Sequence, residues 1–334
     1  MINQAQTKEM HRGPRLSRVY HLEFTGDWGQ ANFHRILSWL TQEFCDRVAP
    51  GSRTRIASIM GGGLEALVDV HRGTADLCIV TPHRLMSKAL TGDGIFSQCG
   101  PMPRLRALVV LPQIDRLMLA IAPAHGIGSF ADLHSKKPAL RFVTSTDAEG
   151  NFIGHVATRF LAAHGITIEM FRDWGGEVIT AHRPDECLEL VRMGRCDAVV
   201  QEAIMTPWWR ELIEGGVLVP VSAEADALSN LESELGMSQA TITPGYWKGC
   251  DVPIRALDFS DFVIVVRDDM PQEVAHLLTW CLVETRTTLE RQYQHIPPDR
   301  SPLSYPLQPA KMARPCLPLH PGAAQYYEEV GLLP

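Results

Sequence analysis

The chain has 334 residues, of which 45% are hydrophobic and 21% charged, and its formal net charge is −7. These values are ordinary for a soluble globular protein, and the length is sufficient for two domains. The acidic balance and the lack of a long basic run argue against binding to nucleic acid, which needs a basic face. No stretch approaches the ~18 consecutive apolar residues of a membrane span, so we expect no membrane insertion.

The first 17 residues predict a disordered leader, and they contain no apolar core of a secretory signal. The 8 cysteines form no C-x-x-C pair, and several fall inside apolar segments. This scatter favours small buried thiols in a reducing compartment over a disulfide framework. The sequence therefore predicts a cytoplasmic protein.

The first half of the chain alternates predicted strands with predicted helices. A strand over 19–24 precedes a helix whose apolar residues recur at helical spacing from Phe33 to Phe44. A strand over 55–59, a helix opened by Gly61-Gly62-Gly63 and a strand over 76–80 follow. This β-α-β-α-β order predicts a parallel sheet with right-handed crossovers.

The pattern restarts after residue 125. Apolar runs over 105–111 and 117–122 precede it, and a short helix over 129–133 leads to a strand over 141–143. Further helices begin near Phe152 and Pro184, and a strand covers 217–221. We expect one long strand over 257–267, a helix from Pro271, and an extended proline-rich segment over 296–318.

Two segments of the chain, 121 residues apart, carry the same pattern. Residues 67–80 and 188–200 each read as a helix end, then Gly-x-x-Asp, then a short apolar run. The glycine suits the left-handed residue that ends a helix, and the apolar run suits a strand buried on both faces. The repeat favours two similar α/β lobes that enclose a cleft. The alternative is that Gly-x-x-Asp is only a common connection between a helix and the strand that follows it.

Three predicted turns lie where a ligand of such a cleft binds, at the carboxyl ends of strands. Their helix N-termini offer unpaired N–H groups, which suit a carboxylate or phosphate; the alternative is that these residues only cap helices. Together with positions after other strands, they give the candidate ligand-binding residues Gly26, Asp27, Trp28, Asn32, Gly62, Gly63, Thr81, His83, Ser145, Thr146, Asp147, Asn151, Glu202 and Trp208.

The acidic candidates favour an amine or a hydroxyl-rich ligand. His83 and Glu202 are the candidate catalytic residues if the protein is an enzyme. The chain has no G-x-G-x-x-G, phosphate loop or nucleophile elbow, so we expect no nucleotide cofactor. No His/Cys spacing indicates a metal site, so we expect neither a metal nor another cofactor.

Four segments, in order along the chain, resemble the TAXI family of solute receptors of TRAP transporters. The first is a glycine-rich turn with its Gly-x-x-Asp unit, at 61–76, and the second is the entry to a second lobe, at 126–133. The third is a return strand, at 256–268, and the fourth is an end that contains His-Pro-Gly-Ala, at 319–331. The chain differs from typical members in lacking a visible secretion signal and in the turns at 30–34 and 145–150.

The resemblance implies an α/β protein of the two-lobed type II periplasmic-binding-protein-like fold, each lobe a mainly parallel sheet flanked by helices. Lobe 1 would comprise 18–122 and 258–334, and lobe 2, inserted, 123–257. The implied function is closure of the lobes on a small polar ligand, with a transporter or sensor protein as a further partner. The alternative is an intracellular, decarboxylase- or lyase-like enzyme on the same fold.

Overall fold

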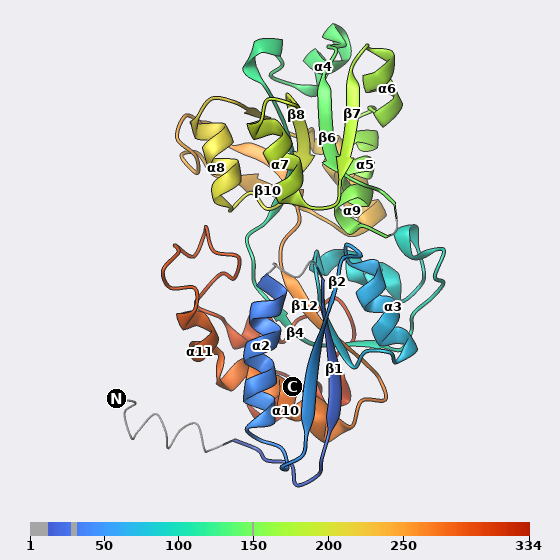
Figure 1. Ribbon diagram of the computed structural model, residues 1–334, viewed down its shortest axis with the longest axis vertical. Helices are drawn as coiled ribbons and strands as arrows, with labels where there is room; N and C mark the ends of the chain where they lie inside the picture. The colour runs from blue at the N-terminus through green and yellow to red at the C-terminus, as the bar shows by residue number, and fades with distance from the viewer. Residues whose placement is uncertain (1–12, 28–31, 149) are drawn as a thin grey trace.

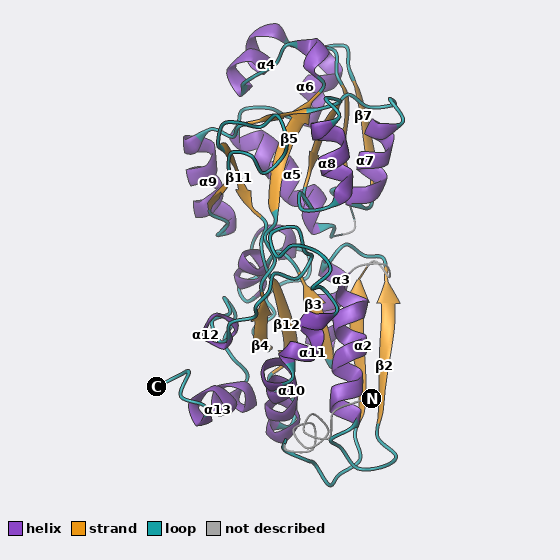
Figure 2. Cartoon of the chain, turned by 90° about the vertical axis from the view of Figure 1, so that its left-hand side faces the viewer, coloured by secondary structure: helices purple, strands orange, loops and turns teal. Residues whose placement is uncertain are grey.

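The computed structural model describes residues 13–27, 32–148 and 150–334. Two lobes lie one above the other, and each is built around a β-sheet with helices packed on it (Figure 1). The view from the side shows that only a narrow waist of chain connects them (Figure 2). The two-lobed α/β fold expected from the sequence is confirmed. The expectation of mainly parallel sheets is wrong, because both sheets combine parallel and antiparallel pairs.

The first lobe contains a five-stranded sheet in the order β2-β1-β3-β12-β4. The strand β1 runs parallel to β2 and β3, whereas β12 runs antiparallel to β3 and β4. The elements are β1 (His21–Asp27), α2 (Asn32–Cys45), β2 (Arg53–Ile59), α3 (Leu64–Arg72), β3 (Leu77–Val80), η1 (His83–Ala89), η2 (Gly94–Phe96), β4 (Leu105–Leu111), β12 (Phe262–Arg267), α10 (Gln272–Glu284), α11 (Arg286–Arg291), α12 (Pro309–Met312) and α13 (Pro321–Glu329).

The second lobe contains a seven-stranded sheet in the order β10-β11-β5-β8-β6-β7, with β9 also paired to β5. The strands β7, β6 and β8 are parallel to one another, and β5 runs antiparallel to its neighbours. The elements are β5 (Arg116–Ile121), η3 (Pro123–His125), α4 (Phe130–Lys136), β6 (Arg141–Ser145), α5 (Phe152–Ala163), α6 (Ile168–Asp173), β7 (Glu177–Ala181), α7 (Pro184–Arg192), β8 (Ala198–Gln201), α8 (Pro207–Glu214), β9 (Val219–Val221), α9 (Ala225–Leu235), β10 (Gln239–Ile242) and β11 (Ile254–Asp258).

The repeated Gly-x-x-Asp pattern has the same structure in both lobes. Gly73 and Gly194 follow α3 and α7 with φ of 80° and 69°, in the left-handed region that glycine favours. The aspartates then bind a backbone N–H near the start of a neighbouring strand: Asp76 accepts from the Glu23 N–H at 2.7 Å, and Asp197 from the Arg141 N–H at 2.8 Å. The pattern therefore aligns β3 with β1 and β8 with β6.

Two expectations about strands are wrong. The apolar run 257–267 is not one strand, because the chain crosses between the lobes at 259–261, where Asp261 has a φ of 68°. The strand β5 belongs to the second sheet and not to lobe 1, because it pairs with β8, β9 and β11. The first crossing therefore lies at 112–115, before the boundary expected between residues 122 and 123. The other lobe boundaries remain a prediction.

Most of the expected leader, residues 1–12, lies outside the described residues. The rest of it, 13–17, lies on the first lobe, where the Leu16 N–H donates to the Arg47 carbonyl at 2.9 Å. No helix in the described part of the chain is long and apolar enough to cross a membrane.

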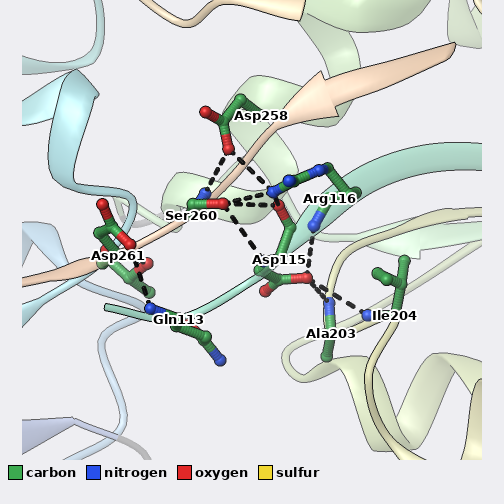
Figure 3. A network of polar contacts seen from close by, with 9 residues as sticks. Gln113, Asp115, Arg116, Ala203, Ile204, Asp258, Ser260 and Asp261 are labelled. Atoms are coloured by element: carbon green, nitrogen blue, oxygen red, sulfur yellow. Dashed lines mark hydrogen bonds and ion pairs between the residues drawn. The ribbon is translucent and has the colours of Figure 1, made fainter. Parts of the chain in front are cut away.

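The two crossing segments pair with each other and form the hinge. The Asp261 N–H donates to the Gln113 carbonyl, and the Phe259 N–H to the Asp115 carbonyl, both at 3.2 Å. Arg116 adds an ion pair to Asp258 at 3.1 Å and a hydrogen bond to Ser260. Figure 3 shows this network, in which side chains and backbone groups of both crossing segments hold the hinge together.

Candidate functional site

A cavity of about 380 Å³ lies between the lobes, next to the hinge. This volume lies within the range of small-molecule sites. Side chains from both lobes and from the hinge line it: Asn32, Phe33, Arg35, Thr81, Gln113, Arg183, Pro184, Asp185, Glu202, Ala203, Met205, Thr206, Trp208, Phe262 and Pro302.

Three helices begin at the wall of this cavity. The first turns of α2, α7 and α8 contribute Phe33, Pro184 and Trp208 to the lining. Helix N-termini carry partial positive charge and unpaired N–H groups. Arg35 and Arg183 add formal positive charge, although Arg183 is paired with Asp185 at 2.7 Å. This side of the cavity suits an anionic or strongly polar group.

The hinge side of the cavity contains two buried carboxyl groups. Asp115 ends the first crossing segment, and one of its oxygens accepts from the N–H groups of Arg116, Ala203 and Ile204 at 2.6, 2.8 and 3.2 Å (Figure 3). The carboxyl of Glu202, which follows β8 and is only 6% exposed, faces Asp115 and lines the cavity.

Burial and mutual contact shift the pKa of both carboxyl groups. Burial raises the pKa of Asp115, while hydrogen bonds to its oxygens oppose the rise. Burial, and then the charge of Asp115, raise the pKa of Glu202 well above its usual value. Two carboxylates in contact inside a protein do not both ionise. The N–H donors on Asp115 favour its charged form, so the rise in pKa is greater for Glu202.

Gln113 supplies an amide to the same side of the cavity. It is only 8% exposed, and its Oε1 is buried without a hydrogen-bond partner among the described residues. Its Nε2 contacts only the sulfur of Met205, at 4.0 Å. The stick view shows this side chain extending away from the backbone that pairs with Asp261 (Figure 3). A buried acceptor without a partner is unusual in a native protein and points to a ligand donor.

The remaining wall is mostly apolar. Phe33 and Phe262 meet edge to face, with ring centroids 5.1 Å apart, and Met205 lies on the opposite lobe. Trp208 is 45% exposed although it is large and aromatic. Such side chains suit the carbon skeleton of a small molecule.

Four of the candidate residues line this cavity, namely Asn32, Thr81, Glu202 and Trp208. Asn32 is also held by the first lobe, since its Nδ2 donates to the Pro302 carbonyl at 2.8 Å and Tyr293 donates to its Oδ1. Asp27, Gly62 and Gly63 line a much smaller neighbouring space of about 10 Å³, which Thr81 also touches.

The glycine-rich turn and the turn at 145–151 meet each other. The Phe152 N–H donates to the Gly62 carbonyl at 3.0 Å, and Gly63 forms a bridge with Asn151. The other side chains of the second turn are used locally: Ser145 accepts from Gln201 at 2.8 Å, Thr146 from the Ala148 N–H at 3.2 Å, and Asp147 pairs with His155 at 3.5 Å. None of these described residues lines the larger cavity.

Two further candidates, Gly26 and His83, lie elsewhere in the first lobe. Gly26 packs against His34, which a side chain at this position would touch at 2.7 Å. His83 accepts from the Cys316 N–H at 2.6 Å within the first lobe, and burial lowers its pKa to about 4. Trp28 lies outside the described residues.

The sequence did not reveal most of the cavity lining. Gln113 and Asp115 lie between the apolar runs at 105–111 and 117–122, and this polar break was a signal for a crossing between lobes. Pro184 and Pro207 marked two helix starts, but no local pattern shows that these helices face α2 across a cleft. Within the described residues, no group of three or more His, Cys, Asp or Glu side chains could hold a metal ion.

Solved structures share this fold at low sequence identity. A protein from Bordetella bronchiseptica matches with a TM-score of 0.52 and 14% identity, over 93% of this chain and 98% of that one. A periplasmic transporter matches with a TM-score of 0.50 and 9% identity, over 93% and 94%. PhnD1 from Prochlorococcus marinus, solved with methylphosphonate, matches with a TM-score of 0.47 and 13% identity, over 78% and 80%.

Comparison with curated protein sequences gives no match. The sequence profile of the NMT1-like family, in contrast, matches residues 47–331, which include both sheets except β1 and both crossing segments of the hinge. The chain belongs to the NMT1-like family.

Proposed function

We propose that this protein is a receptor that closes its two lobes on a small polar molecule. The observation that carries the proposal is the cavity of about 380 Å³, which both lobes and the hinge line together. A ligand in contact with both lobes favours the closed arrangement through its higher affinity for that state. The periplasmic-binding-protein-like fold supports this function, because it provides the hinge that such closure needs.

The test is a thermal-shift screen of a panel of small metabolites, followed by calorimetry of each compound that stabilises the protein. Trp208→Ala removes an aromatic wall of the cavity and should weaken binding by about tenfold or more. Met193→Ala is the matched control, since Met193 is 63% exposed on the same lobe and does not line the cavity. If no compound binds, or if both variants bind equally well, the proposal is wrong.

We further propose that the receptor is of the TAXI type and serves a TRAP transporter or a sensor protein. The four segments that resemble the TAXI family support this subtype. The expected result is that the ligand-loaded protein binds the membrane subunits of a TRAP transporter from the same organism, in biolayer interferometry, more tightly than the free protein. Equal binding of both forms, or none, would contradict the transporter partner.

A second candidate function is an enzyme of the decarboxylase or lyase class in the same cavity. Glu202 favours it, because a buried carboxyl group with a raised pKa beside a cavity can act as a general acid. Each compound found in the screen should therefore be recovered after long incubation and analysed by NMR. A receptor returns it unchanged; an enzyme converts it, and Glu202→Gln stops the conversion.

We also propose that the protein works in a reducing, cytoplasmic environment. All eight cysteines are free, and Cys78, Cys187, Cys196 and Cys281 are buried. Structural disulfides are rare where thiols are kept reduced. Titration of the denatured, unreduced protein purified from its native host should find all eight thiols. A result near two would contradict the proposed compartment.

A further inference from the structure

The hinge side of the cavity is more acidic than its other side. Glu202 lines the cavity there, and Asp115, Asp258 and Asp261 belong to the hinge behind it, where Arg116 is paired with Asp258. The arginines Arg35 and Arg183 line the cavity further from the hinge, beside the N-termini of α2 and α7. The cavity is therefore polarised, with an acidic hinge side.

The hinge side of the cavity also presents hydrogen-bond acceptors that have no donor partner among the described residues. The Oε1 of Gln113 is buried without a partner, and Gln113 lines the cavity. Glu202 lines the cavity as well, and its carboxyl oxygens are further acceptors. Two acceptors beside a net negative charge suit a group with several N–H donors and a positive charge.

We propose that Gln113 and the Asp115–Glu202 pair form a subsite for a primary ammonium group of the ligand, and that the pair gives up its shared proton when this group binds. The inference rests on the proposed receptor function and assigns a chemical class to its ligand. The ammonium group donates to the Gln113 Oε1 and to Glu202. The proton of Glu202 leaves to the solvent, so that one positive charge replaces another.

Two features let the pair lose its proton in the complex. Asp115 keeps its three backbone N–H donors, which stabilise its charge. The ammonium group then compensates the new charge on Glu202, as the proton did before. A neutral amide or hydroxyl group could not do this, because it would leave two adjacent buried carboxylates uncompensated.

The other charged and titratable groups around the pair are fixed by partners of their own. Arg116 is held by Asp258 and Ser260, and Arg183 is held by Asp185. Burial raises the pKa of Asp261 too, but its carboxyl accepts from the Gln113 N–H at 3.0 Å and does not line the cavity. Burial raises the pKa of Tyr246 to about 12, so its phenol stays neutral. The proton released on binding is therefore that of the carboxyl pair.

The experiment measures binding of amines against hydroxyl analogues. The probes are benzylamine with benzyl alcohol, aminomethylbenzoate with hydroxymethylbenzoate, and aminopropylphosphonate with hydroxypropylphosphonate, together with the primary amines of the metabolite panel. Calorimetry in phosphate and Tris buffers gives the number of protons released. We expect about one proton per bound amine, and an affinity that rises up to about tenfold per pH unit below the pKa of Glu202.

Glu202→Gln keeps the size of the side chain and removes the proton that can be released. It should weaken amine binding at least about thirtyfold and abolish proton release, while hydroxyl analogues change little. Glu232→Gln, an exposed acid on α9 of the same lobe, is the control and should leave both unchanged. If Glu202→Gln does not fold, Gln113→Met tests the same subsite through the loss of amine affinity.

The outcomes separate the inference from the receptor function. If panel compounds bind but none is a primary amine, or if amines bind without releasing a proton, the ammonium subsite is wrong and the receptor function stands. If no compound of any class binds, the receptor function fails and the inference fails with it. A carboxylic-acid C=O band in the infrared spectrum of wild type, absent from Glu202→Gln and lost on amine binding, would support the shared proton directly.

Discussion

The side-chain amide of Gln113 lines the cavity in a way that does not stabilise the fold. A buried carbonyl oxygen without a hydrogen bond destabilises a fold by about 1–3 kcal/mol relative to the solvated group. Its Nε2 contact with the Met205 sulfur, at 4.0 Å, offers little in return. Groups of this kind persist where a ligand supplies the missing partner, and activity and stability then oppose each other.

Replacing Gln113 with methionine should therefore separate stability from binding. Gln113→Met keeps most of the volume and removes the unpaired oxygen, so we expect the unliganded protein to melt at the same temperature or a few degrees higher. Ligand affinity should fall by about tenfold or more. A clear loss of thermal stability would show instead that the amide supports the hinge.

The Asp115–Glu202 pair predicts a distinctive dependence of stability on pH. The pKa of Glu202 is raised in the folded state, so the folded protein holds a proton that the unfolded chain loses above pH ~4.5. Stability contributed by this proton is complete below that pH. It is lost as the pH rises toward the folded pKa, by up to about 1.4 kcal/mol per pH unit.

Glu202→Gln removes this proton exchange. The free energy of unfolding of the variant, relative to that of wild type, should therefore increase as the pH is raised above about 5. Chemical denaturation at a series of pH values measures the difference in the free energy of unfolding. The exposed-site variant Glu232→Gln should follow the wild-type profile. Parallel profiles for wild type and Glu202→Gln would mean that Glu202 is already ionised in the folded protein.

At the scale of elements, contacts on two sides of the cavity join the lobes in addition to the hinge. On one side, the turn before α3 forms the bridge between Gly63 and Asn151. On the other, the segment after α11 meets the second lobe, where Arg300 lies over the Tyr246 ring at 3.5 Å and the Tyr246 hydroxyl donates to the Asp299 carbonyl. These contacts therefore hold the two lobes together beside the cavity.

A methyl group at Gly63 should open the first of these contacts. Gly63 has a φ of 120°, and a Cβ there would lie 2.2 Å from the Phe152 ring. Gly194→Ala is a matched control, because its φ of 69° is also positive but no atom lies within 4 Å of the added methyl. Both variants should lose about 1 kcal/mol or more of stability through backbone strain.

We expect only Gly63→Ala to increase the radius of gyration in small-angle scattering and to weaken ligand binding. The reason is that the lobes must separate to accommodate the methyl group, whereas nothing opposes the one at residue 194. An unchanged radius for Gly63→Ala would indicate that the Phe152 ring moves within its own lobe and that this contact does not control opening.

The same elements explain which parts of the molecule the sequence could predict. The strands and helices around Gly73 and Gly194 follow local rules of hydrophobic period and helix termination, so they were predicted nearly at their bounds. The break between β11 and β12 was missed, because an apolar run does not show that its two halves join different sheets. The cavity was largely missed for the same reason: Gln113, Arg183 and Met205 meet only through the arrangement of the two lobes.

At the scale of the whole molecule, the two lobes and the hinge together form one binding site. A ligand in the cavity contacts both lobes, and its binding energy therefore stabilises the closed form over the open one. By mass action it should raise the free energy of unfolding by about 2.7 kcal/mol at a hundredfold excess over its Kd. Scattering from the liganded protein should also give a radius of gyration no larger than that of the free protein.

Two alanine variants locate the ligand within this binding site. Trp208→Ala should reduce the ligand-dependent stabilisation, because it removes part of the cavity wall. Ser145→Ala should lower the melting temperature of the free protein and leave the affinity unchanged, because the Ser145 oxygen accepts from Gln201 inside the second lobe, at 2.8 Å, and does not face the cavity. The opposite pair of results, with binding lost only in Ser145→Ala, would move the ligand to the turn at 145–151, where the sequence alone predicted it.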